Sequence, residues 1–269
     1  MKLPLRFLTL LLLPFSTLAI TDQTTEDLYQ QTCAACHGAD RLAVSGPALL
    51  PETLKRLRKK AAISTITSGR PATQMPPFGE KLSSEQISAL VDHIYQPLPE
   101  VPVWMEAEIS ASHKLFTPLD QLPAKPQHGA DPLNLFFVVE AGDHPATILD
   151  GDKLEPITRF KTRFALHGGA KYSPDGRFVY YATRDGWVTL FDLHSMQMVA
   201  EIRAGINTRN IAISSDGKLV AVGNYLPHNL VLLNANDLSL NSIIPVQSLG
   251  ESSRVSAVYD AAPRKSFIL

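Results

Sequence analysis

The stretch "YSPDGRFVYYATRDGWVTLFDL", residues 172–193, decides the fold of the C-terminal half of this chain. It holds two runs of aromatic and β-branched residues, "RFVYYAT" and "WVTLFDL", and an Asp-Gly pair precedes each. Asp-Gly pairs suit tight hairpin turns, because glycine accepts a positive φ without steric cost. The stretch therefore predicts antiparallel neighbouring strands at 177–183 and 187–193.

The same pattern recurs along residues 133–269. Asp150, Asp192 and Asn234 close three similar strand-like runs at a spacing of 42 residues, and "SSDGKLVAVG" repeats "SPDGRFVYYA" 41 residues later. A period of about 40–45 residues with several strands per unit is typical of β-propeller blades. We expect an incomplete β-propeller over 133–269, with about three blades of a probable eight, and hence an N-terminal fragment of a longer protein. A self-complementing oligomer is the alternative.

The residues before the repeats divide into two parts. Residues 97–132 are rich in proline, which predicts a linker with Trp104 packed on a domain surface. Residues 20–96 predict an all-α domain of three or four short helices. Ser83 and Gln86 form a capping box before the periodic apolar run of 87–94, and Thr24 with Asp27 forms a similar start. The segment 51–69 reads as helix, with Leu54, Leu57, Ala61, Ile63 and Ile66 as its apolar positions and Gly69 at its C-terminal end.

The only two cysteines lie in "CAACH", residues 33–37. This is the attachment motif for a c-type haem: Cys33 and Cys36 add to the two vinyl groups, and His37 coordinates the iron. A redox dithiol would be expected in a βαβ setting, and a zinc site would need two more ligands nearby. We therefore predict one covalent haem c.

The sixth iron ligand is expected on the other side of the ring. Met75 is the only methionine in the helical domain, and Pro76 and Pro77 follow it. A thioether ligand raises the reduction potential relative to a second histidine. His93 is the rival ligand. The segment "SGPAL", 45–49, resembles the class I cytochrome c segment whose proline carbonyl accepts the ring proton of the ligating histidine, which here would be His37.

The N-terminus "MKLPLRFLTLLLLPFSTLAITDQ" has a positive start, an apolar run of about a dozen residues and small residues near Ala19. It predicts a signal peptide, 1–19, cleaved near Ala19, and an exported, periplasmic protein without a membrane span. The net charge of −1 argues against nucleic-acid binding. The basic run of 55–60 could steer small redox partner proteins.

A cytochrome c domain followed by a propeller resembles the family of haem c / haem d1 nitrite reductases and their biosynthetic relatives, over essentially the whole mature chain. Within "RFALHGGAKYSPDGRFVYYATRDG", residues 163–186, the resemblance implies that His167 binds the iron of haem d1 from the proximal side. It also implies a pocket around the carboxylates of haem d1. The expected pocket residues are Arg184, Arg209, Tyr225 and Arg254.

Two departures point to the branch of the family that oxidises dihydro-haem d1 to haem d1. Ala170 stands where the nitrite reductases have an arginine, and the loop after the haem c motif lacks a glycine-rich spacer. The resemblance therefore implies an oxidoreductase that binds dihydro-haem d1, with haem c as electron acceptor. Nitrite reductase forming nitric oxide is one alternative, and a non-catalytic electron carrier or tetrapyrrole-binding module is another. The distal catalytic residues are expected beyond this sequence and stay unknown.

Overall fold

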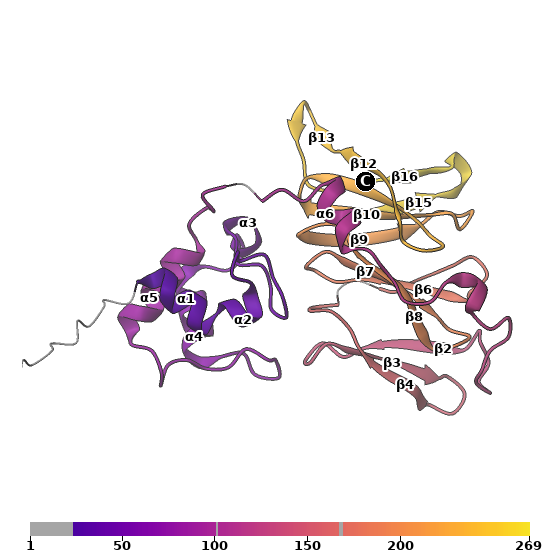
Figure 1. Ribbon diagram of the computed structural model, residues 1–269, viewed down its shortest axis with the longest axis horizontal. Coiled ribbons are helices and arrows are strands. Elements are labelled where there is room, and N and C mark those ends of the chain that lie inside the picture. The colour runs from indigo at the N-terminus through magenta and orange to yellow at the C-terminus, as the bar shows by residue number, and fades with distance from the viewer. Residues whose placement is uncertain (1–23, 101, 167–168) are drawn as a thin grey trace, which may run out of the picture.

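The computed structural model describes residues 24–100, 102–166 and 169–269. A helical domain is followed by a stack of antiparallel sheets, and a connecting segment runs over the sheets (Figure 1). The expected signal peptide, 1–19, and the expected ligand His167 lie outside the described residues. Among the described helices, none is long and apolar enough to cross a membrane.

Five short helices form the N-terminal domain, where three or four were expected. They are α1 Thr25–Thr32, α2 Ala34–His37, α3 Pro51–Leu54, α4 Lys59–Ser68 and α5 Ser84–Ile94. Both predicted capping boxes are present: the Thr24 hydroxyl accepts from the Asp27 backbone N–H, and the Ser83 hydroxyl accepts from that of Gln86. The expected helical segment 51–69 is interrupted at residues 55–58 between α3 and α4, and Gly69 follows α4 with a φ of 68°.

The core of this domain is built around α5. Its side chains Ile87, Leu90, Val91 and Ile94 are all buried, as the periodicity predicted. The apolar positions predicted for α4 were partly wrong: Ala61 and Ile63 are exposed, whereas Ala62 and Ile66 are buried. The helix restarts at Lys59 after the break, so its buried face is not in phase with the residues of α3.

The proline-rich segment 97–132 contains regular structure of its own, although no element was predicted there. It holds α6 Glu106–Ser112, β1 Lys114–Leu115 and η1 Leu119–Gln121. Ile109 of α6 is fully buried in the core of the sheets, and β1 pairs with β8. Trp104 packs against the same core, as predicted, and its indole N–H donates to the Arg203 carbonyl at 2.9 Å.

Three larger sheets follow, and within each the paired strands run antiparallel. The first contains β2 Leu135–Val139, β3 Pro145–Asp150 and β4 Glu155–Lys161. The second contains β5 Lys171–Tyr172, β6 Phe178–Ala182, β7 Trp187–Asp192 and β8 Gln197–Arg203, with β1 at its edge. The third contains β9 Asn207–Ile213, β10 Leu219–Leu226, β11 Asn229–Asn234 and β12 Leu240–Pro245. Two small hairpins complete the described chain: β13 Gln247–Ser248 with β14 Glu251–Ser252, and β15 Tyr259–Ala261 with β16 Ser266–Ile268, joined by η2 Ala262–Arg264.

The sequence repeat corresponds to equivalent positions in these sheets. Asp150, Asp192 and Asn234 are the last residues of β3, β7 and β11. The three predicted Asp-Gly turns are present, and Gly176, Gly186 and Gly217 have φ values of 75°, 97° and 70°. The turn at Gly186 is also sterically closed, because a Cβ there would lie 1.8 Å from the Gly205 carbonyl oxygen. The hairpin strands predicted at 177–183 and 187–193 are β6 and β7.

Candidate functional site

The two cysteines and His37 are brought together by a short helical turn. Cys33 is the C-cap residue of α1 and the N-cap residue of α2, and His37 is the last residue of α2. Both thiols are free: Cys33 is partly buried and Cys36 is exposed. Among the described residues, no cluster of three or more His, Cys, Asp or Glu side chains is arranged to hold a metal ion.

The His37 ring is held in one orientation. It is 8% exposed, and its Nδ1 lies 2.8 Å from the Pro47 carbonyl oxygen, which is the bond expected from the segment 45–49. Burial lowers the pKa of the imidazole, and the bond to the Pro47 carbonyl opposes this shift only partly. The ring is therefore a neutral donor whose Nδ1 proton is directed to Pro47, which leaves Nε2 with a lone pair for a metal.

Gly46 shapes the cradle of this histidine. A Cβ at Gly46 would lie 2.8 Å from Cε1 and 3.0 Å from Nδ1 of His37, so no other residue fits without moving the ring. Two free thiols at the attachment spacing, a neutral oriented imidazole and a cradle that admits only glycine fit a covalently attached haem with an axial histidine.

Met75 lies in the loop between α4 and α5. Its side chain is half-buried and packs against the cluster of Ala62, Ile66, Ile87 and Val91. The loop is folded back on Gly69, since the Arg70 N–H donates to the Met75 carbonyl at 3.0 Å and a Cβ on Gly69 would lie 2.7 Å from that carbonyl oxygen.

The rival histidine is engaged elsewhere. Nε2 of His93 lies 3.5 Å from the Glu26 carboxylate, and its ring packs on Tyr29 with the centroids 5.3 Å apart. These contacts occupy the ring, so Met75 is the better candidate for the second axial position.

Arg209, Tyr225 and Arg254 converge in the third sheet and the loop that follows it. Arg209 is in β9 and Tyr225 is in β10, while Arg254 follows β14. The guanidinium carbons lie over the Tyr225 ring, at 5.6 Å for Arg209 and 4.7 Å for Arg254 from the ring centroid. The Tyr225 phenol shares a hydrogen bond of 3.3 Å with Ser256. This bond is the main cause of a lowered phenol pKa, and the neighbouring arginines lower it further.

Arg184 extends this group from the second sheet. It lies in the β6–β7 turn, and the Thr208 N–H of β9 donates to its carbonyl at 3.0 Å. Partial burial is the main cause of a lowered Arg184 pKa, and the charge of Arg209 adds to it. The structure therefore brings the four expected pocket residues together. A cationic and aromatic cluster of this kind fits a flat anionic ligand, because guanidinium groups pair with carboxylates and stack on π-systems.

Arg203, which the sequence analysis did not single out, joins the two domains. It donates to the Leu42 carbonyl in the helical domain and to the Asp185 carbonyl at 2.8 Å in the sheets. Its guanidinium carbon also lies 4.5 Å from the centroid of the Trp104 ring. Its one sequence signal is an arginine that ends an apolar strand, which is too common to be informative.

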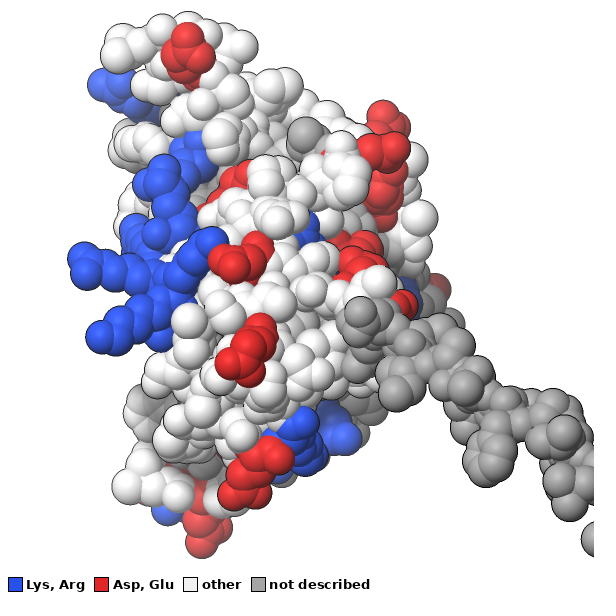
Figure 2. Space-filling model, turned by 90° about the vertical axis from the view of Figure 1, so that its left-hand side faces the viewer, with Lys and Arg blue, Asp and Glu red and all other residues white. Residues whose placement is uncertain are grey.

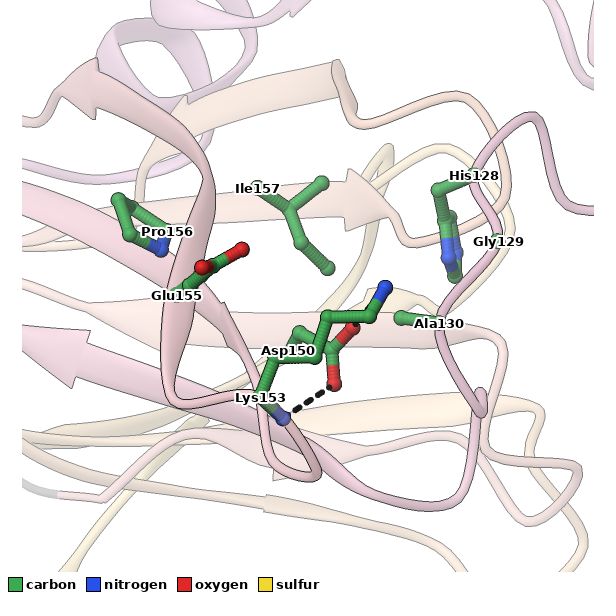
Figure 3. Close-up of a pocket in the computed structure, with 8 residues that line it drawn as sticks. All are labelled: His128, Gly129, Ala130, Asp150, Lys153, Glu155, Pro156 and Ile157. Carbon is green, nitrogen blue, oxygen red and sulfur yellow. Dashed lines mark hydrogen bonds and ion pairs between the residues drawn. The ribbon is translucent and has the colours of Figure 1, made fainter.

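A small polar cavity lies away from these residues, between the 128–130 loop and the strands β3 and β4 (Figure 3). It has a volume of about 170 Å³, and the Lys153 ammonium lies 3.3 Å from the Asp150 carboxylate on its wall. None of the expected ligands lines it, and a volume of this size is too small for a tetrapyrrole.

The comparisons with known families agree with this two-part arrangement. Residues 21–94 match the family "Cytochrome C oxidase, cbb3-type, subunit III", and residues 130–269 match "Cytochrome D1 heme domain". The protein therefore combines a c-type cytochrome domain, whose cofactor is a covalent haem c, with a propeller-like D1 heme domain of many strands. The chain belongs to the Cytochrome D1 heme domain family, whose profile covers more than half of it.

Several characterised relatives span both domains. The chain is 58% identical to "Dihydro-heme d1 dehydrogenase" of Pseudomonas aeruginosa over 245 residues, which is 91% of this chain and 50% of that protein. It is 25% identical to "Nitrite reductase" of Stutzerimonas stutzeri, over 92% of this chain and 46% of the relative. The solved structure "Dihydro-heme d1 dehydrogenase NirN in complex with DHE" matches at 59% identity with a TM-score of 0.84, over 90% of this chain and 52% of that one. The chain thus spans about half the length of the curated relatives that it matches.

Proposed function

We propose that the protein oxidises dihydro-haem d1 to haem d1, with haem c as electron acceptor. The observation that carries this function is the match to a dihydro-haem d1 dehydrogenase, because identity of 58% extends through both domains. The match to a nitrite reductase over the same span is only 25% identical.

The proposal assigns a role to each candidate residue. Cys33 and Cys36 attach haem c, His37 and Met75 coordinate its iron, and His167 is the proximal ligand of the d-type haem. The remaining residues bind the d-type haem around its carboxylates; they are Arg184, Arg209, Tyr225 and Arg254. Their convergence supports this role, since the guanidinium groups of Arg209 and Arg254 lie over the Tyr225 ring and together offer stacking and ion pairing.

The proposed domain limits are 1–19 for a signal peptide, 20–96 for the cytochrome c domain, 97–132 for the linker and 133–269 for the partial propeller. The three larger sheets are proposed to be three blades, because the residues spaced by 42 end equivalent strands. A signal peptide would send the protein to the periplasm.

The chemistry proposed for the pair of sites is a transfer of electrons between domains. Removal of two hydrogen atoms from the substrate releases two protons and two electrons, and haem c supplies a one-electron acceptor. The electrons must leave one at a time, so the reaction needs a small redox partner protein as final acceptor. In the structure, Arg203 holds the two domains in contact through the Leu42 carbonyl.

The test mixes at least two equivalents of the oxidised full-length holoprotein with one of dihydro-haem d1 under anoxic conditions, because each haem c accepts one electron. We expect the absorption spectrum to change to that of haem d1 while haem c becomes reduced. Nitric oxide formation from nitrite by the reduced, haem d1-loaded protein, without substrate oxidation, would instead support the nitrite reductase alternative. Reversible binding of the tetrapyrrole without turnover would support the other alternative, a non-catalytic electron carrier or tetrapyrrole-binding module.

The ligand assignment of Met75 has its own test. Met75→Ala should abolish the weak red charge-transfer band of a thioether-ligated ferric haem and lower the reduction potential, because a thioether favours the ferrous state. His93→Ala is the matched control and should leave the band in place. Survival of the band in Met75→Ala would show that Met75 is not the ligand.

A further inference from the structure

A fourth arginine, Arg56, belongs to the helical domain, and its charge acts on Arg184 and Tyr225 of the sheets. It lies two residues after α3, whereas Arg184, Arg209 and Arg254 belong to the sheets and their loops. We call these four residues the interdomain arginine cluster. In the ribbon, α3 lies on the side of the helical domain that faces the sheets (Figure 1).

The contact beside α3 fixes where Arg56 can be. Ala48 and Leu50, which precede α3, form one buried cluster with Ile206, and Leu226 packs against it. Leu50 and Ile206 are each only 1% exposed, so this contact is closed to water. Ile206 comes directly before β9 and Leu226 ends β10, which are the strands that carry Arg209 and Tyr225. The chain continues from this apolar contact through α3 to Arg56, so Arg56 lies on the side of the helical domain that is next to Arg209 and Tyr225.

The electrostatics of the sheets agree with this position of Arg56. Besides partial burial and Arg209, the charge of Arg56 lowers the pKa of Arg184, and Arg56 also contributes to the lowered pKa of Tyr225. Among the ion pairs of the described residues, none involves Arg56, Arg184 or Arg254. Neighbouring guanidinium groups repel one another, and an anion between them would offset that repulsion.

Arg56 differs from the basic residues around it, because its charge influences the pKa values of Arg184 and Tyr225. The run Lys55, Arg56, Arg58, Lys59 and Lys60 is exposed, and basic side chains gather along one side of the molecule in the view of Figure 2. Lys59, however, pairs with Asp92 of α5 at 2.6 Å. The electrostatic influence on the cluster in the sheets comes from Arg56.

We propose that Arg56 is a substrate-binding residue: it pairs with a carboxylate of the tetrapyrrole held by the sheets, so that both domains bind one ligand. This inference rests on the proposed function, because it takes the cluster of the sheets as the tetrapyrrole site. It adds a contact from the cytochrome domain, and binding of the ligand then strengthens the interface between the two domains.

The experiment titrates the oxidised full-length holoprotein with haem d1 and with haem d1 whose carboxyl groups are methyl esters. Binding is followed by absorption at low and high ionic strength. Arg56→Gln should raise the Kd for haem d1 by about five- to tenfold at low ionic strength, and less at high ionic strength. Arg56→Lys should recover part of the affinity, and the ester should bind equally to wild type and Arg56→Gln.

The matched control is Lys60→Gln, which removes the same charge from the same exposed run and should leave the Kd unchanged. An unchanged haem c spectrum shows that each variant is folded.

Wild-type affinity in Arg56→Gln, together with weakened binding in Arg184→Gln and Arg209→Gln, would overturn the role of Arg56 and leave the proposed site intact. Wild-type affinity in all three variants would overturn both. Equal weakening in Arg56→Gln and Lys60→Gln would also overturn the proposal, because it would indicate a general effect of surface charge.

Discussion

At the scale of single residues, close backbone approaches decide which side chains are possible beside the candidate haem c. The backbone conformation of Gly46 is one that other residues can adopt, so glycine is required there only because a side chain has no space. The His37 ring beside it is buried and hydrogen-bonded to the Pro47 carbonyl, and these contacts fix the position of the ring. The sequence shows the glycine but not the ring against it.

Gly46→Ala should therefore displace the His37 ring and weaken its bond to the Pro47 carbonyl. We expect a lower free energy of unfolding, by about 1–3 kcal/mol, since the added methyl group overpacks a buried contact. The reduction potential of haem c should shift as well, because that bond tunes the ligand. Gly129→Ala is the control, as a Cβ there meets nothing within 4 Å. Equal stability of the two variants would contradict the steric argument.

Asp185 gives a residue-scale prediction on pH. Burial raises the pKa of this carboxyl to about 6, although the Thr183 hydroxyl and the Arg203 charge both lower it. The folded state thus retains the proton over a range in which the unfolded chain has lost it. Stability from this group is present below about pH 4 and is lost as the pH rises to about 6, by up to about 3 kcal/mol.

Asp185→Asn should remove that loss, because an uncharged amide oxygen can still accept from Thr183. Thermal unfolding followed by circular dichroism from pH 4 to pH 7 would measure it. Asp216, in the Asp-Gly turn before β10, provides the contrast: hydrogen bonds from Ser214 and from the Lys218 backbone lower its pKa, so its contribution has the opposite sign. A wild-type pH profile in Asp185→Asn would refute the prediction.

At the scale of secondary-structure elements, α5 shows how far local sequence determines structure. Its four buried residues and its capping box were both predicted, because cap and periodicity act within one helix. The α3–α4 break was not predicted. The Thr53 hydroxyl donates to the Ala48 carbonyl at 2.6 Å and fixes the turn around α3, and Leu54 is buried against α1 and α5. These contacts end α3 at Leu54, although helix propensity alone would allow the helix to continue.

The N-terminal cap of α5 can be measured separately from its packing. Ser83→Ala should lower the free energy of unfolding by about 1 kcal/mol, because the Gln86 backbone N–H loses its acceptor. Ser84→Ala is the neighbouring control, since the Ser84 hydroxyl bonds only to the Glu85 side chain among the described contacts. Its effect should stay within about 0.5 kcal/mol. Chemical denaturation followed by the haem c absorption would compare the two.

At the scale of the whole molecule, the contact between domains rests on few groups. The apolar part is the cluster around Leu50 and Ile206, and the polar part is Arg203 with the Leu42 carbonyl. Arg203 is largely buried, and burial lowers the pKa of its guanidinium, while the nearby charge of Asp185 opposes the shift. Breaking such a buried hydrogen bond leaves the Leu42 carbonyl without its partner.

Arg203→Gln should loosen the interface without unfolding either domain. We expect hydrogen exchange of the backbone at residues 42–50 to increase by about tenfold, with an unchanged haem c spectrum. Arg264→Gln, a change at an exposed position in η2, should leave the exchange at its wild-type rate. If exchange in residues 42–50 stayed protected in Arg203→Gln, the interface would not depend on this side chain.

The sequence by itself determined the features that depend on neighbouring residues. The attachment motif 33–37, the caps of α1 and α5, the three Asp-Gly turns and the paired strands around them all follow from local spacing, and the resemblance to a family supplied the pocket residues. The tertiary structure alone decided which distant groups meet. Arg203 reaches Leu42 across 161 positions of sequence, and the charge of Arg56 acts on Arg184 in another domain. No periodicity encodes such contacts, because they form only when separately folded surfaces with fixed shapes pack together.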